Sequence, residues 1–208
     1  MAIYADELGG SFARPGIIDA VSARGGSGWS TEGGAGTVFV KTPDQSYGDL
    51  IVDNEGYVPA VGATPLRAFP RGTSESIEGT TLVDATNGYT AGNYYEGIWL
   101  NPNVNQGDDH TFLDDTFFPI VANDNESLSV ADAMDAVALA GDTYGAIYVF
   151  DNLEVRGRAT LVSDADVLVL KGDVSSSDSE TFVVDGRLDV HTLELNGVQT
   201  VDVSNGGF

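Results

Sequence analysis

Acidic side chains in one segment of the chain are the residues best suited to do chemistry. Two Asp pairs flank His110 and an Asn- and Asp-rich stretch follows, so the candidate ligands are Asp108, Asp109, Asp114, Asp115, Asp124 and Glu126. Carboxylate oxygens gathered in a loop suit Ca²⁺, which takes about 6–8 oxygen ligands in a flexible geometry. The segment has neither the EF-hand spacing nor the nonapeptide calcium repeat. Two interpretations therefore stay open: a calcium site, and solvated loop acids on a very acidic protein.

Catalysis by the same acids is a weaker hypothesis. Glycoside hydrolysis needs two carboxyl groups about 5–9 Å apart, one of them with a raised pKa. Nucleophile signatures are missing, because the sequence has no Cys and no Gly-x-Ser-x-Gly. Without Cys the chain forms no disulfide and no zinc–thiolate site. We predict that the protein is not an enzyme and has no catalytic residue, and that calcium is its only candidate cofactor.

An aromatic cluster is the best candidate for recognition: Tyr89, Tyr94, Tyr95 and Trp99. Exposed Tyr and Trp beside Asn and Asp are typical of carbohydrate-binding platforms, because the rings stack on the sugar and polar side chains reach its hydroxyls. The competing interpretation is that these rings fill the core where the middle of the chain packs on a β unit. The sequence favours the core interpretation and leaves the sugar platform open.

The charge balance excludes two classes of partner. Lys and Arg number 9 against 32 Asp and Glu, which gives a net charge of −23. Such a field repels phosphate backbones and anionic lipid, so we predict no nucleic-acid binding. No window approaches the run of about 18 apolar residues that a spanning helix needs, so we also predict no membrane insertion. No signal peptide is visible, and we interpret the chain as a mature product or a piece of a longer protein.

Short runs of β-branched and aromatic residues, bounded by Gly, Asn and Asp, predict an all-β fold. Clear examples lie at 37–40, 50–52, 146–150 and 181–184. One exception lies near 130–140. There, Ser129 and Asp132 resemble a capping box, Ala-rich sequence follows, and Gly141 could end the element. This pattern predicts one short helix.

Three zones divide the chain. We expect a Gly-rich β unit at 1–62, a loop-rich middle region packed on it at 63–145, and dense strands at 146–208. The last zone contains an informal repeat, with copies at 151–157, 185–190 and 193–197, and the segment 48–54 has the same form. Each copy alternates apolar and polar residues, which places its Leu and Val on one buried face. The spacing is typical of solenoid rungs or of a tight meander.

Two segments of the first zone resemble a recurring part of very large bacterial cell-surface proteins. They read GGAGTVFVK at 33–41 and YGDLIVDN at 47–54, and the similarity extends over 1–54, 99–103 and 141–144. Those proteins are adhesin-like or haemagglutinin-like chains built on right-handed parallel β-helices. The resemblance implies such a β-solenoid here, interrupted by the loop-rich middle, and it brings no catalytic residue with it.

These patterns together favour an extracellular structural or adhesive segment of a surface protein, serving as a stalk, an adhesion module or a fibre subunit. The alternative is a carbohydrate-binding or polysaccharide-cleaving β-helix domain. The expected partners are neighbouring repeats of a longer chain, or further copies joined end to end into a filament through the strand-like stretches at 2–5 and 198–203. Glycans are a further candidate partner.

Overall fold

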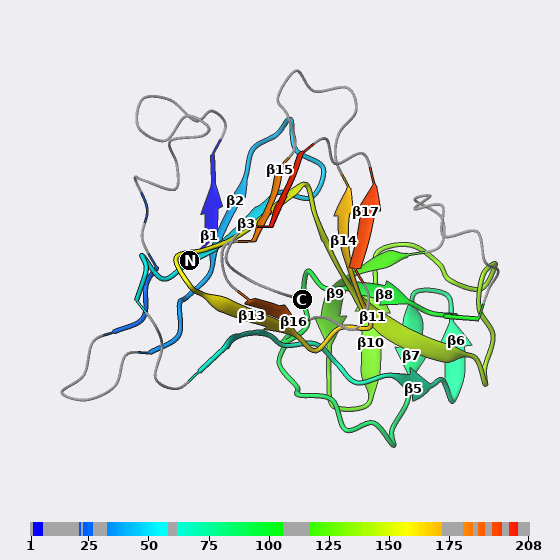
Figure 1. Ribbon diagram of the computed structural model, residues 1–208. Helices are drawn as coiled ribbons and strands as arrows, with labels where there is room; N and C mark the ends of the chain where they lie inside the picture. Colours follow the sequence, from blue (N-terminus) through cyan, green and yellow to red (C-terminus); the bar gives the residue numbers. More distant parts are fainter. Residues whose placement is uncertain are drawn as a thin grey trace. The chain divides into compact units, whose positions relative to one another are not determined.

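The described part of the protein is built from strands alone. The computed structural model describes residues 2–5, 21, 23–26, 33–57, 62–105 and 117–171, and the backbone of strands at 181–184, 187–189, 193–196 and 200–203 (Figure 1). These residues form strands β1 to β18 and no helix, which confirms the all-β prediction. Accordingly, nothing in these ranges is a helix of the length and apolarity needed to cross a bilayer.

The chain divides into two compact units. The first unit comprises Met1–Leu66, Val149–Ser163 and Val169–Phe208, and the second comprises Arg67–Tyr148 and Asp164–Leu168. The sequence predicts boundaries after residues 62 and 145. It does not predict the short return of the chain to the second unit at 164–168.

Parallel pairing dominates the later strands of the first unit. One sheet contains, in this order, β3 (Asp49–Asp53), β12 (Asn152–Arg156), β15 (Thr181–Val184) and β18 (Thr200–Val203), each parallel to the next. A second parallel sheet is formed by β4 (Thr64–Leu66), β13 (Thr160–Ser163) and β16 (Arg187–Asp189). β14 (Val167–Lys171) lies beside β17 (Leu193–Asn196).

The alternating sequence of these strands determines what they bury. Leu153 and Val155 of β12 are fully buried, and they lie in register with Leu50 and Val52 of β3, which are also buried. Side chains two residues apart point to the same face of a strand, so the apolar residues of β3 and β12 form continuous rows from one strand to the other. The expected repeat copies at 185–190 and 193–197 fall on β16 and β17, which belong to other sheets.

Two stacked corners follow β3 and β12. Glu55 and Gly56 have φ of 51° and 81°, and Gly157 and Arg158 have φ of 57° and 61°. The N–H of Gly56 donates to the carbonyl of Gly157 over 3.1 Å, so the two corners are joined directly. Left-handed conformations are costly for residues with a Cβ, which explains the glycine in each corner.

The start of the first unit departs from parallel pairing. β1 (Ala2–Tyr4) is parallel to β2 (Val38–Lys41), but β2 is antiparallel to β3. Val38, Val40 and Ile51 form a small buried cluster on these strands, with partly buried Ile3, Val21 and Ala23 packed against it.

The second unit contains an antiparallel sheet. Its strand order is β11-β8-β9-β10-β7-β6, and β5 pairs with β11. The strands are β5 (Gly72–Thr73), β6 (Ser76–Glu78), β7 (Thr81–Val83), β8 (Trp99–Asn101), β9 (Phe118–Asn123), β10 (Ser127–Val130) and β11 (Thr143–Phe150). One face carries the core of the unit, to which the strands contribute Leu82, Leu100, Phe118, Ile120, Leu128, Val130, Tyr144 and Ala146.

Three expectations need correction or refinement. The sheets do not show the expected parallel β-solenoid, because the sheet of the second unit is antiparallel and β2 reverses direction against β3. The middle region expected to be loop-rich contains that antiparallel sheet, whose short strands of 2–6 residues outside β11 gave a weak sequence signal.

The short helix expected near 130–140 is absent, and that prediction is wrong. The N–H of Met134 donates to the carbonyl of Gly79 over 2.8 Å, and the N–H of Gly79 donates to Asp135 Oδ1 over 2.7 Å. A single turn closes, in which the N–H of Ala138 donates to the carbonyl of Met134. Bonds to the turn at Gly79 replace those that would have propagated a helix.

Candidate functional site

The four aromatic residues predicted to bind sugar lie in three different environments. Tyr89 and Tyr95 are buried, whereas Tyr94 between them in the sequence is 53% exposed. Trp99 is half-buried in β8. The structure therefore does not present the four rings as one platform, and it places Tyr89 and Tyr95 in the core of the second unit.

Trp99 lies on the opposite face of the sheet from the core tyrosines. It pairs with Ile147 of β11, one residue away from the pair formed by Leu100 and Ala146. Leu100 and Ala146 belong to the core of the second unit. Because successive side chains of a strand point to opposite faces, the ring of Trp99 projects away from that core.

Phe69 is the centre of the buried aromatic cluster. Its ring centroid lies 5.6 Å from that of Tyr95, 6.3 Å from that of Tyr89 and 6.2 Å from that of Tyr144. The contacts with Tyr89 and Tyr95 are nearly perpendicular, at 88° and 79°. Edge-to-face packing at these distances is favourable for aromatic rings, so this cluster is a well-packed core.

A buried carboxylate lies next to the cluster. Asp84 is 2% exposed, and its Oδ1 accepts the N–H and the hydroxyl of Thr86, at 3.0 and 2.6 Å, and the N–H of Asn87 at 3.2 Å. Its Oδ2 accepts the hydroxyl of Tyr144 at 2.7 Å. The oxygen of that hydroxyl in turn accepts hydrogen bonds from the hydroxyl of Tyr89 and from Nδ2 of Asn87.

These contacts set the protonation of the network. Burial by itself raises the pKa of Asp84, but the hydrogen bonds from Thr86, Tyr144 and Asn87 outweigh it and hold the pKa below its ordinary value. Burial raises the pKa of both Tyr89 and Tyr144. At neutral pH the carboxylate of Asp84 is therefore ionised and both phenols are neutral. Tyr144 donates its hydroxyl to the carboxylate, and Tyr89 donates its hydroxyl to Tyr144.

Asn123 holds the loop that carries Tyr94. Its Oδ1 accepts the N–H of Tyr95 at 2.9 Å, and its Nδ2 donates to the carbonyl of Thr90 at 2.7 Å. The backbones of Asn93 and Asn123 are also joined, since the N–H of Asn93 donates to the carbonyl of Asn123. The side chain of Asn123 thus bonds to Thr90 before Tyr94 and to Tyr95 after it, and its backbone bonds to Asn93, so the loop that carries the exposed ring is tied to β9.

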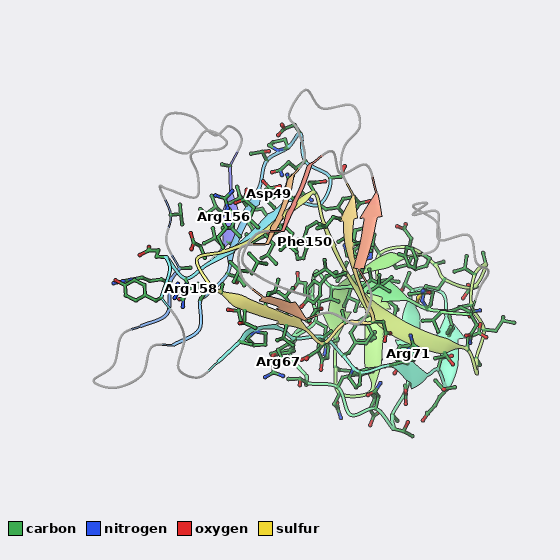
Figure 2. All side chains as sticks on the ribbon, viewed as in Figure 1. Asp49, Arg67, Arg71, Phe150, Arg156 and Arg158 are labelled. Carbon is green, nitrogen blue, oxygen red and sulfur yellow. The ribbon has the colours of Figure 1, made fainter. Side chains whose placement is uncertain are left out.

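Tyr148, Arg67 and Asp164 form a polar group on the surface of the same unit. The hydroxyl of Tyr148 donates to the carbonyl of Arg67 over 2.6 Å, and Nη1 of Arg67 lies 3.1 Å from Oδ2 of Asp164. Burial, followed by the negative charge of Asp164, raises the pKa of Tyr148. Arg67 is labelled in Figure 2, as is Arg71, which pairs with Asp166 at 3.3 Å.

The acids predicted to bind calcium are only partly described. Asp108, Asp109, Asp114 and Asp115 lie outside the described residues. Asp124 Oδ1 accepts the N–H groups of Glu126 and Ser127, at 2.8 and 2.7 Å, and these bonds lower its pKa. The Asp124 carboxylate thus closes the turn between β9 and β10. Within the ranges that the structure describes, no group of three or more acidic, His or Cys side chains could hold a metal ion.

Two buried aspartates of the first unit have structural partners. Asp49, labelled in Figure 2, accepts Nε2 of Gln45 and Nδ2 of Asn152, each at 2.7 Å. Asp151 Oδ2 accepts the N–H groups of Tyr47 and Gly48, at 2.9 and 2.6 Å. Both carboxylates therefore bridge the segment around β3 to β12.

Sequence reasoning did not single out Asp84, Tyr144, Tyr148 or Arg67 of the second unit. The sequence did contain a pattern that could have identified Asp84. Asp followed by Thr86 and Asn87 is typical of an Asx turn, in which the carboxylate accepts backbone N–H groups that follow it. Tyr144, Ala146 and Tyr148 are spaced two residues apart, and this spacing predicts that their side chains lie on the same face of one strand. No pattern in the neighbouring sequence identifies Arg67 as a residue with a particular role.

Comparison with known proteins adds no assignment. Neither the protein-family models, nor the curated proteins, nor the solved structures gave a match to this chain.

Proposed function

We propose that the protein is an extracellular structural or adhesive segment of a surface protein, and that its first unit is part of a right-handed parallel β-solenoid. The observation that supports this most is the parallel register of β3, β12, β15 and β18, in which Leu50, Leu153, Phe182 and Val201 are successive Cα partners. Strands contributed in this order by a chain that returns to the same sheet are the pattern of a solenoid.

Two further features support the stacking of coils: a second parallel sheet and the hydrogen bonds between the corners. The second parallel sheet, β4-β13-β16, follows the same order along the chain, because each of its strands comes after one strand of the first sheet. The corners between the two sheets also stack, through the bond from Gly56 to the carbonyl of Gly157 and the bond from Asn54 to the carbonyl of Arg156. A coil that bonds to the next coil at its corner and along two faces is suited to bear load.

The net charge of −23 fits a location outside the cell and argues against anionic partners. In this proposal the chain has no catalytic centre. The acids of the first unit hold strands together, as Asp49 and Asp151 do, and the acids of the second unit close turns, as Asp84 and Asp124 do.

Hydrogen exchange tests the coil directly. If β3, β12 and β15 belong to one stacked element, their backbone amides should exchange together and slowly, because opening any one of them breaks bonds on both of its edges. Fast exchange of β15 beside a slow β3 and β12 would contradict a continuous stack.

Labelling of intact cells tests the location. An antibody against the chain should bind unpermeabilised cells of the source organism or material shed into the medium. Label that is seen only after permeabilisation would overturn the surface assignment.

A further inference from the structure

The sequence Asn125-Glu126-Ser127 matches Asn-x-Ser, an acceptor motif of N-linked glycosylation. It is the only Asn-x-Ser/Thr triplet in the 208 residues of the sequence. The motif lies where β9 ends and β10 begins, and these two strands pair antiparallel. A motif of three residues also occurs by chance, so the accessibility and bonding of Asn125 decide what weight it has.

The side chain of Asn125 is exposed and has no hydrogen bond to any residue that the structure describes. In this it differs from the asparagines whose side chains hold the described fold together, which are Asn54, Asn87, Asn93, Asn101, Asn103, Asn123 and Asn152. A group added to Nδ2 of Asn125 would therefore break none of the hydrogen bonds of the described residues.

The backbone of the same turn is well bonded. The carbonyl of Asn125 accepts the N–H of Tyr89 at 3.2 Å, and the carbonyl of Glu126 accepts the N–H of Asp84 at 2.9 Å. Asp124 closes the turn, because its Oδ1 accepts the N–H groups of Glu126 and Ser127. Asn125 thus takes part in the fold through its backbone, and its side chain amide is left accessible on an ordered turn.

From these features we propose that Asn125 is a site of N-linked glycosylation. The donor is a sugar whose C1 carries a phosphate ester, linked either to a lipid or to a nucleotide. In the transfer, Nδ2 of Asn125 forms a bond to C1 and the C1–O bond breaks. The phosphate leaves with the electron pair of that bond, and Nδ2 loses one proton. The product is a bulky, solubilising group on the surface of the second unit.

Ser127 supplies the hydroxyl that the motif requires at its third position. In the folded turn this hydroxyl bonds to the carboxylate of Asp124. The hydroxyl is accessible to a transferase only while that bond is open. We therefore expect the sugar to be transferred before the turn between β9 and β10 closes.

The glycosylation site goes beyond the proposed function, and it rests on that function only in expecting a chain that is exported. The two can fail separately. An unmodified Asn125 on a chain that antibodies detect on intact cells would overturn the glycosylation alone. A glycan on a chain that is labelled only after permeabilisation would overturn the surface location alone.

The test is mass spectrometry of the full chain purified from its source cells, with fragmentation of the peptide that contains residues 123–127. We expect the mass of one or more sugar residues on Asn125. Asn125→Gln and Ser127→Ala should abolish this addition, whereas Ser127→Thr should retain it because threonine also has a hydroxyl. The proposal is overturned if Asn125 is unmodified throughout, or if the addition survives in Ser127→Ala.

A second arm distinguishes the two donors. Unmodified full chain is diluted from urea into the membrane fraction or into the soluble extract of the source cells, because lipid-linked sugars stay with the membranes and nucleotide-linked sugars do not. Transfer in one fraction identifies the donor, and transfer in neither overturns the proposal. Chain that is folded beforehand should accept much less sugar, and equal transfer would contradict the order of events.

Asn105→Gln is the matched control. Asn105 is also exposed, and its side chain has no hydrogen bond to a described residue, but Gln and Gly follow it in the sequence. Its replacement should leave the added mass unchanged. A glycan on Asn105 in place of Asn125 would show that exposure and not the motif selects the site, which would overturn the proposal. Asn125→Gln should leave the melting temperature of the unglycosylated chain unchanged, so that a lost glycan cannot be attributed to misfolding.

Discussion

The hydroxyl of Tyr144 donates to the buried carboxylate of Asp84 over 2.7 Å, and this bond joins β11 to the turn that follows β7. The two residues are 60 positions apart in the sequence. Among the described residues, each hydrogen bond to the carboxylate comes from Thr86, Asn87 or Tyr144, and none comes from a cationic side chain. Asp84 is therefore ionised in the interior on the strength of neutral donors alone.

Asp84→Asn should reduce stability at neutral pH by about 1–3 kcal/mol, because an amide NH₂ would face groups that already donate. The folded pKa of Asp84 is lowered, so its contribution is present above the unfolded pKa and is lost as the pH falls through the folded pKa. Thermal unfolding at pH 7 and in steps below pH 5 measures both effects. The variant should be less stable at pH 7, and the difference from the parent should shrink in acid.

Asp132→Asn controls for the loss of one charge. Asp132 is exposed and has no hydrogen bond or ion pair among the described residues. Its replacement should change the melting temperature little at any pH. If both variants shifted it equally, the effect would be one of net charge and not of the buried network.

Tyr144→Phe should destabilise the protein by about 1–3 kcal/mol, because Asp84 loses a donor while Tyr89 and Asn87 lose an acceptor. Tyr148→Phe is the comparison on the same strand. It removes the hydrogen bond to the carbonyl of Arg67, at a half-buried position and away from the buried carboxylate, and should cost less. The denaturant midpoints of the two variants measure the difference. An equal loss would show that the buried network around Asp84 contributes no more than the half-buried Tyr148 hydroxyl does.

Gly157→Ala should destabilise the corner after β12 more than Gly56→Ala destabilises the corner after β3. Both glycines have positive φ, so each substitution carries the left-handed cost of about 1–2 kcal/mol. A Cβ at Gly157 would also overlap the carboxylate of Asp53 and the backbone of Glu55, whereas a Cβ at Gly56 meets nothing within 4 Å. Melting temperatures of the two variants measure the difference. A smaller loss for Gly157→Ala would argue against the packed corner.

Calcium should raise the melting temperature if the acids at 108–126 bind it, because a ligand bound by the folded state alone stabilises that state by mass action. Magnesium should do less, since it demands a strict octahedral geometry. Sodium chloride at matched ionic strength controls for screening of the −23 net charge. Equal shifts with all three salts would remove the calcium hypothesis.

Alternation along single strands was enough to predict much of the fold. The repeat at 151–157 coincides with β12, and its Leu153 and Val155 are fully buried as the period of two requires. The same rule fails to separate Trp99 from the tyrosines, because the face on which Trp99 lies depends on its pairing with Ile147. That pairing spans 48 positions, and nothing in the local sequence reports it.

Long-range polar contacts account for the other misses. Residues 130–140 have helix-like composition, but their amides bond to a turn about 55 positions earlier, and tertiary contacts override a local preference of that size. The Asp84 network likewise joins residues that the sequence gives no reason to bring together. The exposure of Tyr94 depends on Asn123, which is buried and bonded for reasons visible only in the folded loop.

The division of the chain into two units limits how fragments of the protein can be designed. The second unit is interrupted, since it is made of Arg67–Tyr148 and Asp164–Leu168 with Val149–Ser163 belonging to the first. A fragment that stops at Tyr148 would lose Asp164 and Asp166, the partners of Arg67 and Arg71. Neither unit can be excised or transplanted as one uninterrupted stretch, so gene fusion and recombination would have to carry at least residues 67–168 together to preserve the second unit intact.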